Sequence, residues 1–353
     1  MFKRRMTRTK RTITILVALT LIVTGQLILR QREEVDLELY PQLIPQVLPA
    51  ISTDQSVIVH DPYDYPGEYY KAQLHMHTNK SLDGKWSTET AVNAYYEAGY
   101  TYLAITDHDR VTLFDGINDP NFVIIAGEEN TVPWPFWPLG AHMLRLFVDS
   151  PQRSGNAQTR ISSAVRADGI AGIAHPNWSG NLTTGKWTLP QMLALHDYTL
   201  VEVYNPHSNS RKDTATWHEL IRRLGPEISV WAIAVDDAHD ENLFNRGWVM
   251  VKTEGVSEEA LKEALLRGSF YASTGPTVVF GVEDGVITAR IEGDEPAEIS
   301  FIAGNGEVVY SITSTEGSYE PKGNEGFIRV EVETKRGKRA WSQPFWLEVG
   351  EAL

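Results

Sequence analysis

Cysteine is absent from the 353 residues of this sequence. Its absence excludes disulfide bonds, thiolate zinc sites, iron–sulfur ligation and a cysteine nucleophile, so histidine and carboxylate side chains must supply any metal or acid–base chemistry. It does not indicate a compartment, because extracytoplasmic proteins need not carry disulfides. The chain also lacks a GxSxG nucleophile elbow and a GxxxxGK[ST] phosphate loop, which argues against the hydrolases and nucleotide triphosphatases that depend on them.

Positive charge is scarce. The chain has 32 Lys and Arg against 46 Asp and Glu, a net charge of −14, and six of the basic residues lie within the first 29 positions. Without the six positive charges of that segment, the remaining residues carry a net charge of −20. Non-specific binding to duplex nucleic acid depends on clustered Lys and Arg, so no double-stranded nucleic acid partner is expected. An anionic substrate would need a local positive group, such as a metal ion.

Long apolar runs are limited to one, at residues 12–29, where 18 residues carry no charge. About 20 apolar residues cross a bilayer as a helix, so the run predicts one transmembrane anchor. The basic segment before it, residues 1–11, places the N-terminus in the cytoplasm. We therefore expect a single-pass protein of the cell membrane with an extracytoplasmic body. A cleaved signal peptide is the alternative, although no small-x-small cleavage site precedes Gln31.

The rest of the chain divides into three parts by its proline content and its pattern of apolar residues. Five prolines between residues 30 and 68 indicate a stalk or a wrapping segment. In residues 69–276, apolar runs of strand length alternate with amphipathic segments, which is typical of βα units on a parallel sheet and of a barrel-like α/β fold. Ser87 and Ser257 are expected to cap two of the helices, which end near Gly99 and Gly268. Residues 277–353 have short alternating runs that predict a small antiparallel β domain.

Histidine and carboxylate groups collect where the predicted strands end. His75 and His77 lie two positions apart, so on a strand both rings project to one face and can share a metal ion. In α/β barrels functional groups gather at the carboxyl ends of the strands, which makes the recurrence of such clusters informative. The candidate ligands are His75, His77, Asp83, His108, Glu129, His142, His175, Asp237 and His239.

Nine such ligands exceed what one ion can use, so the sequence predicts a site with two or three divalent metal ions. Imidazole and carboxylate without thiolate suit zinc, manganese or iron. The remaining histidines carry weaker signals. Among them, His207 in the loop after residues 200–204 is a candidate substrate contact.

The motifs HMH-x5-DG, ITDHD, AGEE, AHML, IAHP and VDDAH, in this order across residues 69–276, resemble those of the PHP (polymerase and histidinol phosphatase) superfamily of metal-dependent phosphoesterases. The resemblance implies a distorted (β/α)7 barrel with up to three metals at its carboxyl mouth. It implies that His75, His77, Glu129 and Asp237 bind the first metal, and that Glu129 bridges to a second held by His142 and His175. Asp83, His108 and His239 would hold the third.

The resemblance further implies hydrolysis of a phosphomonoester or phosphodiester by metal-activated water. The expected substrate is a phosphorylated small molecule or an envelope polymer. Asp107 and Arg145 are the predicted catalytic residues: Asp107 as a proton donor or a partner of the ligating histidines, Arg145 as a phosphate contact. Lys80, Arg110 and Arg211 are further candidates for phosphate contact, and Asp109, Asp236 and Asp240 for the role given to Asp107.

Aromatic residues occur in the loops after the strand ends, above all in the PWPFWP loop at residues 133–138. They could stack on a base, a sugar or a lipid headgroup region. The alternative is that they pack together as the rim of the barrel.

Two alternatives to the enzyme stay open. One is a non-catalytic protein that binds an envelope ligand and uses its metals structurally. The other is a metal-dependent amidohydrolase, which uses related ligands but usually a carboxylated lysine or a different motif order.

Overall fold

The computed structural model describes residues 56–133 and 137–350. Its first half alternates strands with helices, as the sequence predicts. Ser87 caps the first described helix by accepting a hydrogen bond from the Thr90 amide, and Ser257 caps the last in the same way through the Ala260 amide. The last helix ends at Gly268 in the left-handed conformation that glycine favours, with φ 81°. The elements in chain order are β1 (Val57–His60), β2 (Glu68–Gln73), α2 (Thr88–Glu97), β3 (Tyr102–Ile105), β4 (Val123–Thr131), β5 (His142–Leu146), α3 (Ala157–Arg166), β6 (Ile170–Ile173), η3 (Asn181–Thr183), α4 (Leu189–Leu193), β7 (Leu200–Tyr204), α5 (Ser210–Leu224), β8 (Trp231–Ala234), β9 (Trp248–Thr253), α6 (Glu258–Arg267) and β10 (Phe270–Ser273).

The strands β2 to β8 are neighbours in sequence order within one mixed sheet. β2, β3 and β4 are parallel, and so are β6, β7 and β8. β5 runs antiparallel to both of its neighbours, which corrects the expectation of a uniformly parallel sheet. The reason is the short connection between β4 and β5, because a parallel return needs a crossover of a dozen or more residues, usually a helix.

The two ends of this series meet beyond the ends of the strands. The Asp237 amide donates to the His75 carbonyl at 3.0 Å, and the His77 amide donates to the Ala238 carbonyl at 3.0 Å. The segments that follow β2 and β8 therefore lie side by side. β3, β6 and β8 are buried along their whole length, as expected for strands covered on both faces.

The chain after β10 forms antiparallel strands around a separate apolar cluster that contains Phe301, Val330 and Phe345. β17 pairs with β10, so the sheet continues from the first part of the fold into the second. The predicted boundary between residues 276 and 277 stays a prediction. These strands are β11 (Val278–Glu283), β12 (Val286–Ile291), β13 (Ala297–Ala303), β14 (Val308–Ser314), β15 (Glu316–Tyr319), β16 (Phe327–Glu333), β17 (Arg339–Trp341) and β18 (Phe345–Val349).

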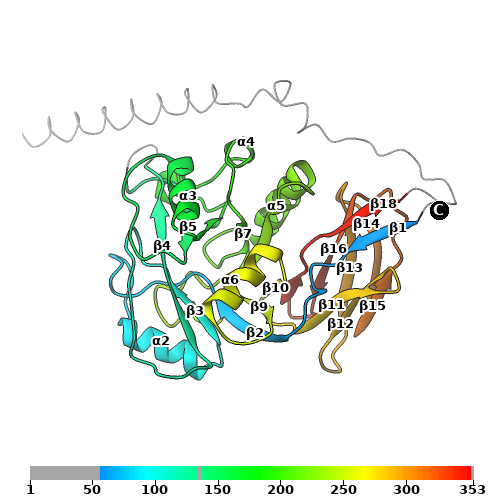
Figure 1. The fold of residues 1–353 in the computed structure, drawn as a ribbon, viewed down its shortest axis with the longest axis horizontal. Coiled ribbons are helices and arrows are strands. Elements are labelled where there is room, and N and C mark those ends of the chain that lie inside the picture. Colours follow the sequence, from blue (N-terminus) through cyan, green and yellow to red (C-terminus); the bar gives the residue numbers. More distant parts are fainter. Residues whose placement is uncertain (1–55, 134–136, 351–353) are drawn as a thin grey trace, which may run out of the picture. The chain divides into compact units, whose positions relative to one another are not determined.

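Residues 56–68, the described part of the predicted stalk or wrapping segment, pack against the C-terminal strands. β1 pairs with β18, and the two strands lie next to each other in Figure 1. The Tyr63 side chain is buried, and its hydroxyl accepts a hydrogen bond from the Gln343 amide at 2.7 Å. This stretch therefore wraps the fold.

The predicted membrane anchor at residues 12–29 lies outside the described residues. Within residues 56–133 and 137–350, no helix combines the length and the apolar character needed to cross a bilayer. The expectation of a single-pass membrane protein with an extracytoplasmic body is corrected accordingly, because this finding gives it no support.

Candidate metal centre

Four buried side chains converge where the ends of β2, β4 and β8 meet. The Nε2 atoms of His75 and His77 lie 3.1 Å apart. Asp237 Oδ1 is 3.3 Å from His75 Nε2 and 3.1 Å from His77 Nε2. Glu129 Oε2 lies 3.5 Å and 3.2 Å from the same two nitrogens. Two imidazole nitrogens and two carboxylate oxygens thus surround one point.

Strand geometry brings these groups together. The period of two along the chain sends His75 and His77 to one side of the backbone after β2. The same alternation on β4 separates Glu129, which faces this point, from Glu128, which pairs with Arg145. Asp237 follows β8 in the left-handed backbone region, with φ 46°. Such a conformation is costly for a residue other than glycine and is common at functional sites.

The carboxylate oxygens at this point lack hydrogen-bond donors. Glu129 Oε2 and Asp237 Oδ1 are fully buried, and among the described residues neither receives a hydrogen bond of acceptable geometry. A buried anion without a partner is costly, so such atoms call for a cation. The residues therefore fit a divalent metal ion, which two carboxylates and two imidazoles suit in number and chemistry.

Glu129 also contacts a second set of imidazoles through its other oxygen. His142 Nδ1 and His175 Nε2 each lie 2.9 Å from Glu129 Oε1. His142 begins β5 and His175 follows β6, so three neighbouring strands contribute to this group. The structure thus brings together the residues that the sequence assigned to a second metal, with one carboxylate shared between the two groups.

A third group lies at the more exposed edge. Asp83 Oδ2 is 3.4 Å from the Nε2 atoms of both His108 and His239. His239 Nδ1 lies 2.9 Å from the backbone carbonyl of Asp237. Because a carbonyl can only accept, His239 donates a hydrogen from Nδ1 to it, and Nε2 faces Asp83. His108 Nδ1 also approaches Glu129 Oε2 at 2.9 Å, which links this group to the first.

The electrostatics favour ionised carboxylates and a neutral His77. Burial alone would raise the pKa of Glu129 and Asp237, but the surrounding imidazoles outweigh it and hold both pKa values well below their usual range. Burial and the neighbouring His239 and His108 lower the pKa of His77. Carboxylate and neutral imidazole are the forms that bind metal ions.

Glu202 holds two of the candidate metal-binding histidines and was missed by the sequence reasoning. Its side chain is fully buried, with Oε1 2.7 Å from His75 Nδ1 and Oε2 accepting from the His175 amide at 2.7 Å. The carboxylate keeps the hydrogen of His75 on Nδ1, so that Nε2 faces the metal position. The available signal was a single glutamate inside the apolar strand β7.

Asp107 is a positioning residue, which agrees with the second of its two predicted roles, a partner of the histidines, and argues against the first, a proton donor. Its carboxylate is fully buried and accepts hydrogen bonds from Thr78, Ser81 and Thr112, so it is not exposed to a substrate. Since Ser81 Oγ donates to Asp107, it accepts from His77 Nδ1 at 3.0 Å and leaves His77 Nε2 free. Asp107 thus acts on His77 through Ser81.

Arg145 does not reach the site, and its predicted contact with phosphate is corrected. It lies on β5 opposite Glu128 and points to the same side as that residue, and its side chain is buried in an ion pair with it. The alternation of β5 places His142 on the other side. The other candidates for phosphate contact differ in position. Arg211 pairs with Glu333 outside the cavity, while Lys80 and Arg110 line the cavity.

The three acidic alternatives to Asp107 have structural partners. Asp109 accepts from the Thr131 amide and from Trp137 Nε1. Asp236 accepts from Tyr95 and from the backbone amides of residues 245–247, and Asp240 pairs with Lys85. Asp109 alone of the three lines the cavity.

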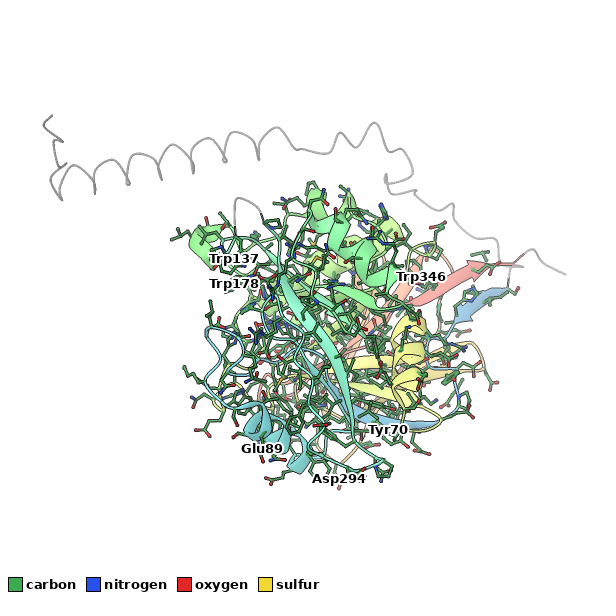
Figure 2. All side chains as sticks on the ribbon, turned by 60° about the vertical axis from the view of Figure 1, so that its left-hand side comes forward. Tyr70, Glu89, Trp137, Trp178, Asp294 and Trp346 are labelled. Atoms are coloured by element: carbon green, nitrogen blue, oxygen red, sulfur yellow. The ribbon has the colours of Figure 1, made fainter. Side chains whose placement is uncertain are left out.

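A cavity of about 780 Å³ opens over these groups. That volume is within the range of about 300–1,000 Å³ that small-molecule sites occupy. Its lining includes His207, whose Nε2 donates to the Asp237 carbonyl at 3.2 Å, and two cations that the sequence reasoning missed, Arg153 and Arg160. Trp137 and Trp178 also line it, and both are labelled in Figure 2.

The other aromatic candidates differ in place. Trp86 and Trp187 are buried, and their indole nitrogens donate to the backbone carbonyls of His77 and His142 at 2.7 and 2.8 Å. They belong to the packed rim. Residues 134–136 of the PWPFWP loop lie outside the described residues.

Comparison with known proteins finds likeness in structure alone. No protein-family model and no curated protein matches the chain. Solved structures similar to it include PHP-like phosphoesterases. One is a two-domain protein from Bacteroides vulgatus containing a predicted PHP-like metal-dependent phosphoesterase, at 15% identity and TM-score 0.47, covering 82% of this chain and 94% of that one.

Two further structures cover a smaller share of this chain. A lesion-specific endonuclease from Pyrococcus furiosus is 13% identical at TM-score 0.41, with 56% of each chain covered. A proposed metal-dependent phosphoesterase from Bifidobacterium adolescentis is 13% identical at TM-score 0.38, covering 56% of this chain and 96% of that one.

Proposed function

We propose that this protein is a PHP-type metal-dependent phosphoric ester hydrolase that acts on a phosphorylated small molecule. Its strands β2 to β8 would form the distorted barrel of that fold, with two or three zinc, manganese or iron ions at the carboxyl ends. The observation that carries the proposal is Glu129, whose two oxygens face two different sets of imidazoles. A shared carboxylate of this kind holds two cations close together.

The residues of the site would have three roles: metal binding, orientation of the imidazoles and attraction of the substrate. His75, His77 and Asp237 would complete the first metal position with Glu129, and His142 and His175 the second. Bound metal ions supply an activated water at neutral pH and neutralise the charge of the phosphate. Glu202 and Ser81 orient the imidazoles, while Lys80 and Arg110 at the cavity wall attract the anionic substrate.

Metal content and hydrolysis together test the proposal. The full-length protein, loaded with manganese or zinc, is assayed with p-nitrophenyl phosphate as a monoester and bis(p-nitrophenyl) phosphate as a diester. We expect metal-dependent release of nitrophenol from one of them, at least two bound ions per chain by elemental analysis, and loss of both properties in His75→Ala and Asp237→Ala.

His196→Ala is the matched control, because the His196 side chain is 63% exposed and lies outside the cavity lining. It should keep both metal and activity. Bound metal without hydrolysis of either ester would overturn the enzymatic proposal and favour a non-catalytic ligand-binding protein. Absence of metal binding would overturn the site itself.

A further inference from the structure

Trp178 lies directly on the second group of histidines. Its ring centroid is 5.2 Å from that of His142 and 4.9 Å from that of His175. The side chain is half-buried and lines the cavity, so part of the indole stays open to a ligand. Trp178 is therefore placed to contact the organic part of a ligand whose phosphate lies at the metal centre.

The loop around Trp178 holds the indole in place. A Cβ atom added at Gly180 would lie 2.0 Å from Trp178 Cζ2, and one at Gly185 would lie 2.5 Å from Cε3, so glycine is needed on both sides of the ring. Asn181, Leu182 and Thr183 between them all have positive φ, from 52° to 74°. Three successive residues in this costly conformation indicate a loop whose shape serves a function.

Trp137 is held near the same cavity by its polar atom. The indole is 56% exposed, and its Nε1 donates to Asp109 Oδ2 at 2.8 Å. The two tryptophan-bearing loops are tied together, because Asn181 Nδ2 donates to the carbonyls of Pro138 at 3.1 Å and Gly140 at 3.0 Å. Trp137 is therefore an exposed but anchored aromatic side chain, which is typical of a recognition surface.

Apolar side chains line the same cavity as the two indoles, among charged and polar ones. Pro133, Pro138 and Leu82 line the same cavity, and the Leu82 side chain is 95% exposed. Both donors of the Asn181 amide group are already used between the loops. A planar ring binds to flat apolar surfaces, and the two indoles supply surfaces of that kind.

We propose that Trp178 and Trp137 form a subsite for a planar aromatic ring in the organic part of the substrate, which makes the substrate an aryl or nucleoside phosphate. The inference rests on the proposed function, because the metal centre supplies the phosphate end. Stacking on indole faces does not select one ring chemistry, so a simple aryl group and a nucleobase share this recognition.

Binding of phosphonates, which carry no hydrolysable ester, tests the subsite without turnover. In the full-length, manganese-loaded protein we expect 1-naphthylmethylphosphonate to bind about tenfold or more tightly than methylphosphonate by calorimetry, and Trp137→Ala and Trp178→Leu to remove most of the difference. Leu113→Ala is the control, because Leu113 is 72% exposed and does not line the cavity. It should keep the difference. Equal affinities in the wild type would overturn the inference.

A kinetic comparison then distinguishes a simple aryl phosphate from a nucleoside phosphate as the substrate. We measure kcat/KM for 2-naphthyl phosphate, adenosine monophosphate, glycerol phosphate and glucose 6-phosphate. A preference for either ring-bearing ester supports the subsite and identifies its source, and a preference for glycerol or glucose phosphate overturns it. If no ester is hydrolysed while the phosphonates are still discriminated, the proposed function fails and the subsite stands.

Discussion

His218 makes the stability of this protein depend on pH. It lies on α5 and connects that helix to the C-terminal strands, since Arg329 Nε donates to its Nδ1 at 2.9 Å and its Nε2 lies 3.2 Å from the Gly304 carbonyl. With an arginine donating to one nitrogen and a carbonyl accepting from the other, the ring is neutral. Burial, and then the positive charge of Arg329, lower the pKa of His218 to about 4.

The sign follows from the direction of this shift. The unfolded chain binds a proton near pH 6.5 and the folded protein only near 4, so the stability contributed by His218 is complete above pH 6.5 and is lost as the pH falls. The linkage relation gives a loss of roughly 2 kcal/mol in the free energy of unfolding between pH of about 7.5 and about 5. The loss reaches about 3 kcal/mol once the pH is below the pKa values of both the unfolded and the folded state. Nearby Glu219 favours the charged form and Arg222 opposes it, and both effects are smaller.

Urea unfolding of the full-length protein at a series of pH values measures this loss. His218→Gln keeps an N–H donor for Gly304 but does not titrate, so its free energy of unfolding should fall less steeply than that of the wild type by roughly 2 kcal/mol over the same range. His196→Gln, at an exposed position, is the control and should follow the wild type. Parallel curves for the wild type and His218→Gln would refute the reasoning.

Three further predictions concern the metal centre and a helix. Glu202→Gln replaces the acceptor that faces His75 Nδ1 and should weaken metal binding about 10- to 100-fold by calorimetric titration, while Glu298→Gln, at the exposed position of β13, should not change it. Unchanged affinity in Glu202→Gln would show that this carboxylate does not orient the ligand. Ser257→Ala removes the cap of α6 and should cost about 1 kcal/mol in urea unfolding, and a variant as stable as the wild type would contradict the capping role. Chelation should lower the melting temperature, and metal restored at about 100 times its Kd should return roughly 2.7 kcal/mol, because the unpartnered carboxylate oxygens regain a cation. A melting temperature insensitive to chelator would contradict the metal assignment.

Much of the site was accessible to sequence reasoning because its ligands follow strands. His75, His108 and His175 each come after an apolar run, and the carboxyl ends of neighbouring strands share one edge of a sheet. Asp83 was harder to justify from its own neighbourhood, since a carboxylate beside a glycine is usually a turn residue. It was counted as a candidate because it lies near the histidines in sequence, and the family resemblance assigned it to a third metal. The structure places it 3.4 Å from two histidines.

The proton-donor role considered for Asp107 and the phosphate contact considered for Arg145 fail for one reason, which is the direction of the side chain. Asp107 and Arg145 are both close in sequence to ligands, yet one is enclosed by hydroxyl donors and the other faces Glu128 across the strand pair. Proximity along the chain says little about direction at a turn or on a strand whose pairing is unknown. For the same reason Glu202, far from every motif, was not recognised as the partner of His75.

Local sequence determined the elements of this protein and the chemical type of its ligands. Capping serines, glycine at a helix end and apolar runs act over a few residues, so their effects can be predicted from the chain alone. Only the tertiary structure decided which nitrogen of each imidazole faces the metal position and which tryptophans stay exposed. These properties depend on contacts between residues distant in sequence, and such contacts exist only once the strands have paired.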